Sequence, residues 1–381
     1  MEACELYLHV PFCLRKCRYC DFLSFPAAEE TQKKYLEVLA GEIRRTAPAE
    51  RIDVRSVFFG GGTPSLLPGE AIAELMETVR EHFRLLPSAE VTLEANPGTF
   101  DRSKAEKWLA AGVNRISMGV QSFDDALLAR LGRIHDAETA RRQFALLREG
   151  GFRNLSMDLM MGLPGQTAGT WERTLREAVS LGPEHLSCYS LIVEEGTPFF
   201  AEQEAGALEL PSEEEERAMY GFTCDFLAGQ GFAQYEISNF ARPGYESVQN
   251  SGYWQRVPYF GFGLGAASLV LGEEGERRYS NVRELRSYLG SAGNPSLLHT
   301  EEELLSDTDR EEEFMFLGLR MNEGVNAERF RETFGVSLGE VYGKALRDNI
   351  GKGLMEEADG RFRLTARGRD LGNLVFGSFL Q

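Results

Sequence analysis

The segment Cys13-Leu-Arg-Lys-Cys17-Arg-Tyr-Cys20 places three thiols within eight residues, directly after the apolar, β-rich run Glu5–Val10. Thiolates are soft ligands that suit iron–sulfur clusters and zinc. Four cysteines occupy every iron of a cubane cluster, whereas three leave one iron open to an external ligand. The segment therefore predicts a metal centre with a vacant coordination position at the end of the first strand.

A zinc site is the alternative interpretation of the same segment. The three cysteines together with His9 would make a Cys3His set, which is a common structural zinc arrangement. The other cysteines, Cys4, Cys188 and Cys224, are scattered along the chain, and isolated cysteines of this kind are usually buried thiols rather than ligands.

Five more β-rich runs follow the first one and alternate with helical patterns. They are Ser56–Gly60, Val91–Ala95, Arg115–Val120, Asn154–Met160 and His185–Val193. Strand–helix alternation favours an α/β fold with a parallel sheet or barrel. Six such units are two short of a full (β/α)8 barrel, so we expect an open, partial (β/α)6 TIM-like barrel over residues 1–240.

The remainder of the chain predicts an extension and a second, smaller domain. Residues 241–300 indicate an irregular extension that completes the side of the barrel, and the acidic stretch Thr300–Asp309 indicates a linker. Residues 301–381 predict a small winged-helix-like domain, because helical patterns are followed by a hairpin signal at Asp359–Gly360. The expected helices are Glu311–Met321, Ala327–Phe334, Ser337–Lys352 and Ala366–Leu380. Ser337–Lys352 is nearly neutral, so we expect a packing or lid role rather than DNA binding.

Composition narrows the classes of function. A net charge of −18 and a pI near 4.9 argue against binding to nucleic acid or to anionic membranes, which both need clustered basic residues. No run approaches the ~18 apolar residues of a membrane-spanning helix, and the first ten residues lack the pattern of a signal peptide. We therefore expect a cytoplasmic protein with reduced cysteines, a setting that favours a metal site over disulfides.

The cysteine spacing resembles the signature of the radical S-adenosylmethionine (SAM) superfamily, and Gly60–Pro64 resembles that family's glycine-rich turn for the SAM amino group. The likeness extends to the coproporphyrinogen dehydrogenase-like branch and covers nearly the whole chain. Its other segments are Tyr7–Cys13, Glu94–Gly98, Ser117–Phe123, Leu131–His135, Met157–Thr167, Gly261–Ser268 and Glu313–Arg320. The resemblance implies a [4Fe–4S] cluster on Cys13, Cys17 and Cys20, with SAM bound against it.

The resemblance also implies roles for eleven cofactor-binding positions. Those matching family contacts to the cluster-bound SAM are Tyr7, Gly61, Glu94 and Ala267. Those matching positions that line the rest of the pocket, where the dehydrogenase holds a second SAM, are Tyr19, Gly62, Thr63, Gln121, Arg133, Asp158 and Ser190. Each has a structural alternative; Gln121 can cap a strand, and Arg133 and Asp158 can form an ion pair.

Two departures separate this chain from the dehydrogenases, which carry an N-terminal extension and a fourth cysteine two positions after the third. Here that position is Phe22, and only six residues precede Tyr7. Both features resemble the HemW-type haem chaperones. The chain also departs from those chaperones, because Gln249 and Ala267 stand where their motifs have histidine. Axial haem ligands are usually His, Cys, Met or Tyr. The remaining candidates for a haem ligand are His9, His135 and Tyr253.

The resemblance therefore implies two hypotheses. The first is a haem chaperone that binds haem or a similar porphyrin and transfers it to an acceptor protein. The second is an oxygen-independent coproporphyrinogen III oxidase-like enzyme, or a related radical SAM methyltransferase, that uses SAM for radical chemistry on a substrate. Either one needs an external electron donor for the cluster.

Overall fold

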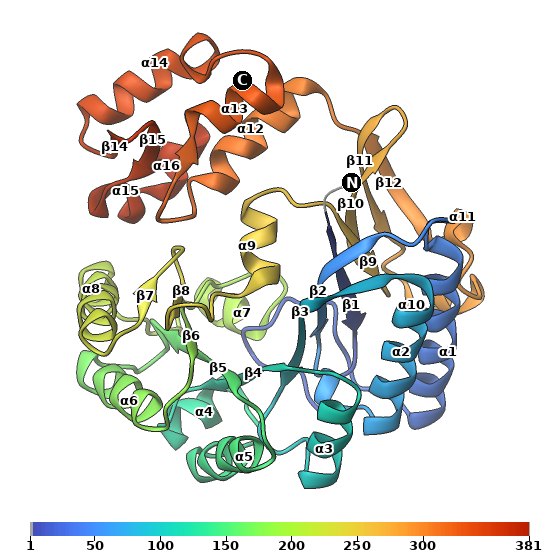
Figure 1. Cartoon of the computed structure of the whole chain (residues 1–381). Coiled ribbons are helices and arrows are strands. Elements are labelled where there is room, and N and C mark those ends of the chain that lie inside the picture. Colours follow the sequence, from blue (N-terminus) through green and yellow to red (C-terminus); the bar gives the residue numbers. More distant parts are fainter. Residues whose placement is uncertain (1–2, 381) are drawn as a thin grey trace.

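The computed structural model describes residues 3–380, which form one large mixed sheet with a separate small domain (Figure 1). Six consecutive strands pair in parallel in the order in which they occur along the chain. They are β1 (Cys4–Val10), β2 (Asp53–Gly61), β3 (Arg84–Ala95), β4 (Arg115–Gln121), β5 (Asn154–Met161) and β6 (His185–Ser190). The predicted six-stranded α/β barrel is confirmed, and the sheet stays open because its strand order runs from β12 to β7 without closing.

Helices cover the outer face of the parallel strands, where alternate residues of each strand are buried. In β1, for example, Leu6, Leu8 and Val10 are fully buried in the main hydrophobic core. The covering helices are α1 (Glu29–Thr46), α2 (Gly69–His82), α3 (Arg102–Ala110), α4 (Asp125–Leu131), α5 (Ala137–Glu149), α6 (Ala168–Ser180) and α8 (Glu213–Gly229). The other residues of the strands face the lumen, because side chains alternate along a strand.

The region after β6 is more regular than the sequence indicates. The strand β9 (Tyr259–Phe262) pairs in parallel with β1, and β10 (Ala267–Gly272) and β11 (Gly275–Asn281) continue the sheet in antiparallel pairing. On the far side of β6 lie the short strands β8 (Asn239–Ala241) and β7 (Ala233–Gln234). The remaining small elements here are η1 (Pro64–Leu66), α7 (Pro198–Glu204), α9 (Val248–Trp254), α10 (Leu285–Gly290) and α11 (Pro295–Leu298).

The prediction of a linker at Thr300–Asp309 is wrong. Its first half belongs to the edge strand β12 (His299–Leu304), which pairs with β11, and its second half begins helix α12 (Asp307–Gly318). Side chains on an edge strand face solvent, so a run of three glutamates is compatible with pairing. The helix start is fixed by Ser306, whose hydroxyl accepts from the Asp309 N–H in a capping box.

The C-terminal domain has its own core and its own three-stranded antiparallel sheet. It comprises α12, β13 (Val325–Asn326), α13 (Ala327–Phe334), α14 (Leu338–Gly351), β14 (Met355–Ala358), β15 (Arg361–Leu364), α15 (Ala366–Asp370) and α16 (Gly372–Gly377). Asp359 and Gly360 both have positive φ, at 53° and 71°, as a type I′ turn between β14 and β15 requires. The predicted winged-helix-like domain is thus present, although two short helices replace the single last helix predicted.

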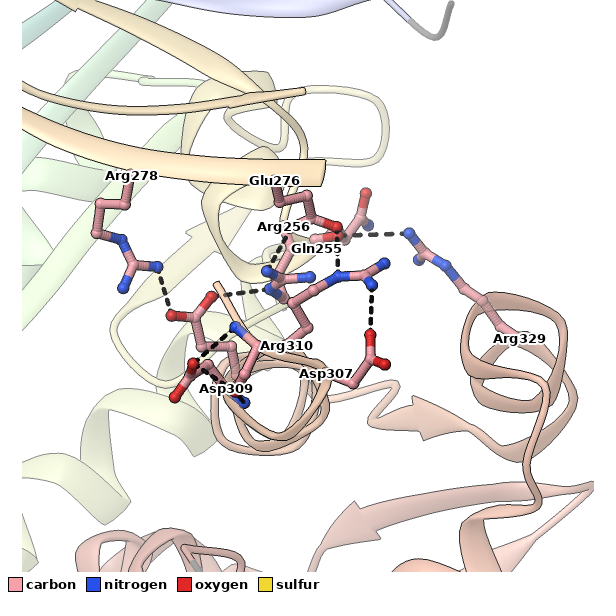
Figure 2. A network of polar contacts seen from close by, with 10 residues as sticks. Gln255, Arg256, Glu276, Arg278, Asp307, Asp309, Arg310 and Arg329 are labelled. Carbon is pink, nitrogen blue, oxygen red and sulfur yellow. Dashed lines mark hydrogen bonds and ion pairs between the residues drawn. The ribbon is translucent and has the colours of Figure 1, made fainter. Parts of the chain in front are cut away.

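The C-terminal domain packs against the end of the barrel at which the parallel strands begin, with α9 between them (Figure 1). Arg256 follows α9, is 6% exposed on its side chain, and pairs with both Glu276 of β11 and Glu313 of α12. Arg310 joins the same network through Glu276, as Figure 2 shows. Arg278 joins it through Glu313. These pairs fix the small domain to the sheet, at the opposite end from the cysteine segment.

No helix within residues 3–380 is long and apolar enough to cross a membrane.

Candidate functional site: a cavity through the barrel lumen

The three clustered cysteines stand at the mouth of a cavity of about 490 Å³ that fills the lumen. They follow the carboxyl end of β1, and the loop is closed at its base where the Cys13 N–H donates to the Phe25 carbonyl at 3.2 Å. All three thiols are free and partly buried. Burial raises the pKa of the Cys13 and Cys20 thiols, so a bound cation is needed to hold these two groups as thiolates near neutral pH.

Arg133 ties this loop to the lumen. Its Nη1 lies 3.6 Å from the Cys17 Sγ, and its Nη2 donates to the Gly119 carbonyl at 2.6 Å and to the Asn96 side chain. The geometry differs from the Arg133–Asp158 ion pair considered above, because the guanidinium faces the cysteine loop. The guanidinium therefore lies beside one of the three predicted cluster ligands.

The glycine turn after β2 is held tightly by the chain itself. A Cβ on Gly61, where φ is +109°, would lie 2.5 Å from the His9 ring, and a Cβ on Gly62 would lie 2.6 Å from the Phe12 carbonyl oxygen. The sequence argument required glycine for close approach of a ligand. The structure adds a second reason, because a side chain at Gly61 would collide with His9 of β1, and one at Gly62 would collide with the backbone of Phe12.

Two acidic side chains are buried in the lumen. Burial raises the pKa of Glu94 to about 8, and the nearby Asp158 adds to the rise, while the Gly61 N–H and Arg115 oppose it. The Gly61 N–H donates to the Glu94 Oε2 at 3.1 Å. Burial also raises the pKa of Asp158, which accepts from the Ser117 hydroxyl at 3.1 Å. A cationic ligand would favour the ionised form of both acids, and SAM, which carries a sulfonium and an ammonium group, fits this requirement.

Gln121 ends β4 in a strained conformation. Its φ is +67°, unusual for a residue with a side chain, and the β4–β5 register shifts at this point. Its Oε1 accepts from the Tyr189 hydroxyl at 2.8 Å. Such strain is concentrated at functional sites, and here it turns the Gln121 amide into the lumen. The structural alternative of a simple strand cap does not describe this geometry.

All of the predicted site residues except Tyr7 and Ala267 line this one cavity. The lining members are Cys13, Cys17, Tyr19, Cys20, Gly61, Gly62, Thr63, Glu94, Gln121, Arg133, Asp158 and Ser190. Tyr7 lies beside them, with its hydroxyl 2.9 Å from the His9 Nδ1 and its ring stacked on Phe58, which does line the cavity. Ala267 lies at the start of β10, one strand beyond β9.

His9 does not face the cysteines as a zinc ligand would. Its Nδ1 is hydrogen-bonded to the Tyr7 hydroxyl and its Nε2 lies 3.0 Å from the Leu23 carbonyl, so both ring nitrogens have partners. Within the part of the chain that the structure describes, no three His, Cys, Asp or Glu side chains converge on a point suited to one metal ion. A cubane distributes its three thiolates over three different irons and does not need that convergence.

The three candidate haem ligands are not presented on the cavity surface. His9 has the partners just described, and His135 is buried with its Nε2 3.2 Å from the Val120 carbonyl. Burial lowers the pKa of His135 to about 4. Tyr253 packs edge-on against Tyr259 at 4.8 Å. Gln249, which stands in place of the family's histidine, is only 1% exposed.

Sequence reasoning missed several lining residues. Arg115, which is 2% exposed and lies at the start of β4, reaches into the lumen 3.9 Å from Glu90. Asn239 and Asn250 come from β8 and α9 and line the far end of the cavity. Asn96, which accepts a hydrogen bond from Arg133, lies in the Glu94–Gly98 motif, so the motif could have revealed it.

Comparisons with known proteins agree with this geometry. Residues 7–178 match the radical SAM superfamily, and residues 305–371 match the HemN C-terminal domain. The solved structure of coproporphyrinogen III oxidase (HemN) from Escherichia coli, described as a radical SAM enzyme, superimposes with a TM-score of 0.85 at 25% identity, covering 99% of this chain and 90% of that one.

Curated relatives with the name heme chaperone HemW match along almost the entire chain. The Bacillus subtilis protein is 39% identical, with 98% of each chain covered. The protein of Escherichia coli K12 is 35% identical over 99% of this chain and 98% of its own length. These likenesses confirm the family predicted from the motifs: the chain belongs to the HemW haem-chaperone family of the radical SAM superfamily.

Proposed function

We propose that this chain binds haem and transfers it to an acceptor protein, with a [4Fe–4S] cluster and SAM bound at the mouth of the lumen. The observation that carries the proposal is near full-length similarity to proteins named heme chaperone HemW, at 39% and 35% identity. The absence of a fourth cysteine at Phe22, where the dehydrogenases have one, supports the same choice.

Cys13, Cys17 and Cys20 are the residues that would hold the cluster. Their thiols line one cavity mouth, and Arg133 supplies positive charge beside Cys17. When bound, the cluster supplies one-electron chemistry and an open iron for SAM, and an external protein donor would provide the electron. All six cysteines are free, which fits the reducing cytoplasm that we propose as the location.

SAM would lie in the lumen beside the cluster. Glu94 and Asp158 offer carboxylates to its cationic groups, and the Gly60–Gly62 turn exposes backbone rather than side chains. Residues 1–240 carry all of these groups, so we propose that they form the cofactor-binding part. Residues 241–300 complete the side of the barrel, and residues 301–381 serve as a packing domain rather than a lid over the cysteines.

An anaerobic haem titration of the cluster-reconstituted chain tests the proposal, followed by the Soret absorbance. We expect saturable binding near one haem per chain, and we expect that haem to move to an apo-haemoprotein added in excess. Binding that never saturates, or that is matched by an unrelated acidic protein of similar size, would contradict the chaperone function.

A radical SAM enzyme is the second candidate, favoured by the convergence of the predicted SAM residues on one cavity. It predicts substrate-dependent formation of 5′-deoxyadenosine in the reduced protein, and a loss of that product in the Cys17→Ala variant. The same amount of product with and without coproporphyrinogen would contradict the oxidase-like form of this candidate.

A further inference from the structure

Four large apolar side chains are exposed around the mouth of the cavity. Leu14 is 58% exposed, Phe22 60%, Ile134 45% and Ile192 68%, and all four line the cavity. They come from three separate segments: the cysteine loop, the loop after α4 and the loop after β6. We call this set the apolar rim. Exposed apolar side chains that gather at one opening mark a binding surface, whereas scattered ones need no explanation.

The rim is held in place by hydrogen bonds between its segments. Arg15 donates from Nη2 to the carbonyls of Gly132 and Arg133, at 2.7 and 2.9 Å, which joins the cysteine loop to the segment that carries Ile134. Lys16 Nζ donates to the Phe22 carbonyl at 2.9 Å and closes the loop on itself. Leu14, Phe22 and Ile134 therefore stand on a fixed frame, and their exposure does not result from a loose loop.

The charges on the rim suit an amphiphilic anion. Arg15 and Lys16 are exposed on the cysteine loop and line the same opening, which the acidic residues Asp21 and Glu194 also line. A planar ligand with apolar faces and carboxylates along one edge can place its faces on the rim and its carboxylates toward Arg15 and Lys16. Haem has this shape and charge, with two propionates on one edge.

Within residues 3–380, the other positions considered for a haem ligand are buried. Position 249 is 1% exposed at the far end of the barrel, under the C-terminal domain. His9 and His135 are buried, 8% and 7% exposed, and each has a ring nitrogen within hydrogen-bonding distance of a backbone carbonyl. The mouth is the one opening of the lumen at which the described residues combine exposed apolar side chains with exposed cations.

Resting on the proposed function, we propose that haem is held on the apolar rim of Leu14, Phe22, Ile134 and Ile192, over the cluster site, and that its propionates face Arg15 and Lys16. Binding at this site relies on apolar contact and charge, since the rim offers no histidine. Haem held in this way would have no ligand from the rim to exchange when an acceptor protein takes it over.

The test uses the full chain with its cluster reconstituted, haem as the probe and the Soret band as the readout. The rim variant is Phe22→Ser with Ile192→Ser. The matched control is Leu297→Ser with Leu374→Ser, at positions that are 60% and 61% exposed but do not line the cavity. Removing two exposed apolar side chains from the contact should weaken haem binding by about ten-fold or more, and the control should bind like the wild type.

A second pair of measurements tests the propionates. Lys16→Gln should weaken the binding of haem and leave the binding of haem dimethyl ester almost unchanged, because the glutamine amide can still donate to the Phe22 carbonyl and the ester lacks the carboxylates. Iron and sulfide content, measured on each variant, shows that the cluster remains.

The outcomes separate the two proposals. A wild-type chain that binds no haem overturns the proposed function. A wild type and a rim variant that bind haem equally well overturn only the rim site. A rim variant that binds haem normally but does not transfer it to the acceptor also overturns the rim site. That result would assign the rim to contact with a protein partner instead.

Discussion

The two ends of the barrel lumen are built differently. At the carboxyl ends of the parallel strands, three partly buried thiols lie within a ring of exposed apolar side chains. At the opposite end, α9 and the C-terminal domain cover the strands, and Gln249 and Arg256 are almost fully buried. One end is therefore an opening and the other a sealed base.

The two ends also differ in which parts of the family pattern they contain. The opening keeps the cysteines and the lining residues that the resemblance predicts. The sealed base has lost the histidine at position 249, and its burial gives a haem no access there. Each of the following experiments changes one end and compares it with the other.

The largest effect is expected for Cys17→Ala at the opening. Only two thiols would remain, and a second iron of the cluster would have no protein ligand. We therefore expect a nearly complete loss of cluster iron and sulfide after anaerobic reconstitution. Cys224→Ala is the matched control, because Cys224 lies on α8 away from the cavity, and its iron content should be unchanged. Equal iron in both variants would mean that the cluster is not bound at the opening.

We expect that replacing Arg256 destabilises the sealed base. Arg256→Ala leaves Glu276 and Glu313 partly without their partner in a buried setting, and we expect a loss of about 3–5 kcal/mol of unfolding free energy. Arg277→Ala breaks exposed pairs with Glu274 and Glu302 and should cost less than ~1 kcal/mol. Urea unfolding monitored by fluorescence measures both, and similar losses in the two variants would contradict the sealed base.

Inside the lumen, Glu94 should make stability depend on pH. Its pKa of about 8 in the folded chain lies above its ordinary value of 4.5. Between these values the unfolded chain has released the proton and the folded chain keeps it, so this group lowers stability as the pH rises, by at most about 1.4 kcal/mol per pH unit. Glu94→Gln should therefore be stabilised relative to the wild type by an amount that grows from pH 5 to about pH 8. A difference that stays constant with pH would show that Glu94 ionises normally.

The smallest effect is expected for Gln249→His. Restoring the family's histidine at a position that is 1% exposed should leave the haem affinity and the Soret band unchanged. A thermal melt of the variant checks that it is folded. A shifted Soret band in the folded variant would show that α9 moves away and that the base opens in solution.

Much of the fold was predictable because each parallel strand carries its own local signal. The strand β4, predicted at Arg115–Val120, ends one residue later, at Gln121. The strand β9 was missed because it is short and its pairing partner, β1, begins at the other end of the chain, with Tyr259 opposite Glu5. Local patterns cannot report pairing over such a distance.

Those site residues that lie within the family's sequence motifs could be predicted from the sequence. The glycine turn and Glu94 could be placed from their segments alone. Arg115 could not, because an arginine at the start of a strand usually points to solvent, and here it is 2% exposed inside the lumen. Asn250 was missed for another reason, since it lies on the short helix α9, which follows the parallel strands in the sequence and matches none of the motifs.

The place of β1 in the sheet has a consequence for biosynthesis. β1 leads directly into the cysteine loop, and it pairs on one side with β2 and on the other with β9, which ends at Phe262. The Gly263 N–H, just beyond, donates to Glu42 on α1. The ribosome must therefore release residue 262 before the strand beneath the cysteines has both neighbours. The cysteine loop therefore gains the full support of the sheet only after about two thirds of the chain, up to residue 262 of 381, has been synthesised.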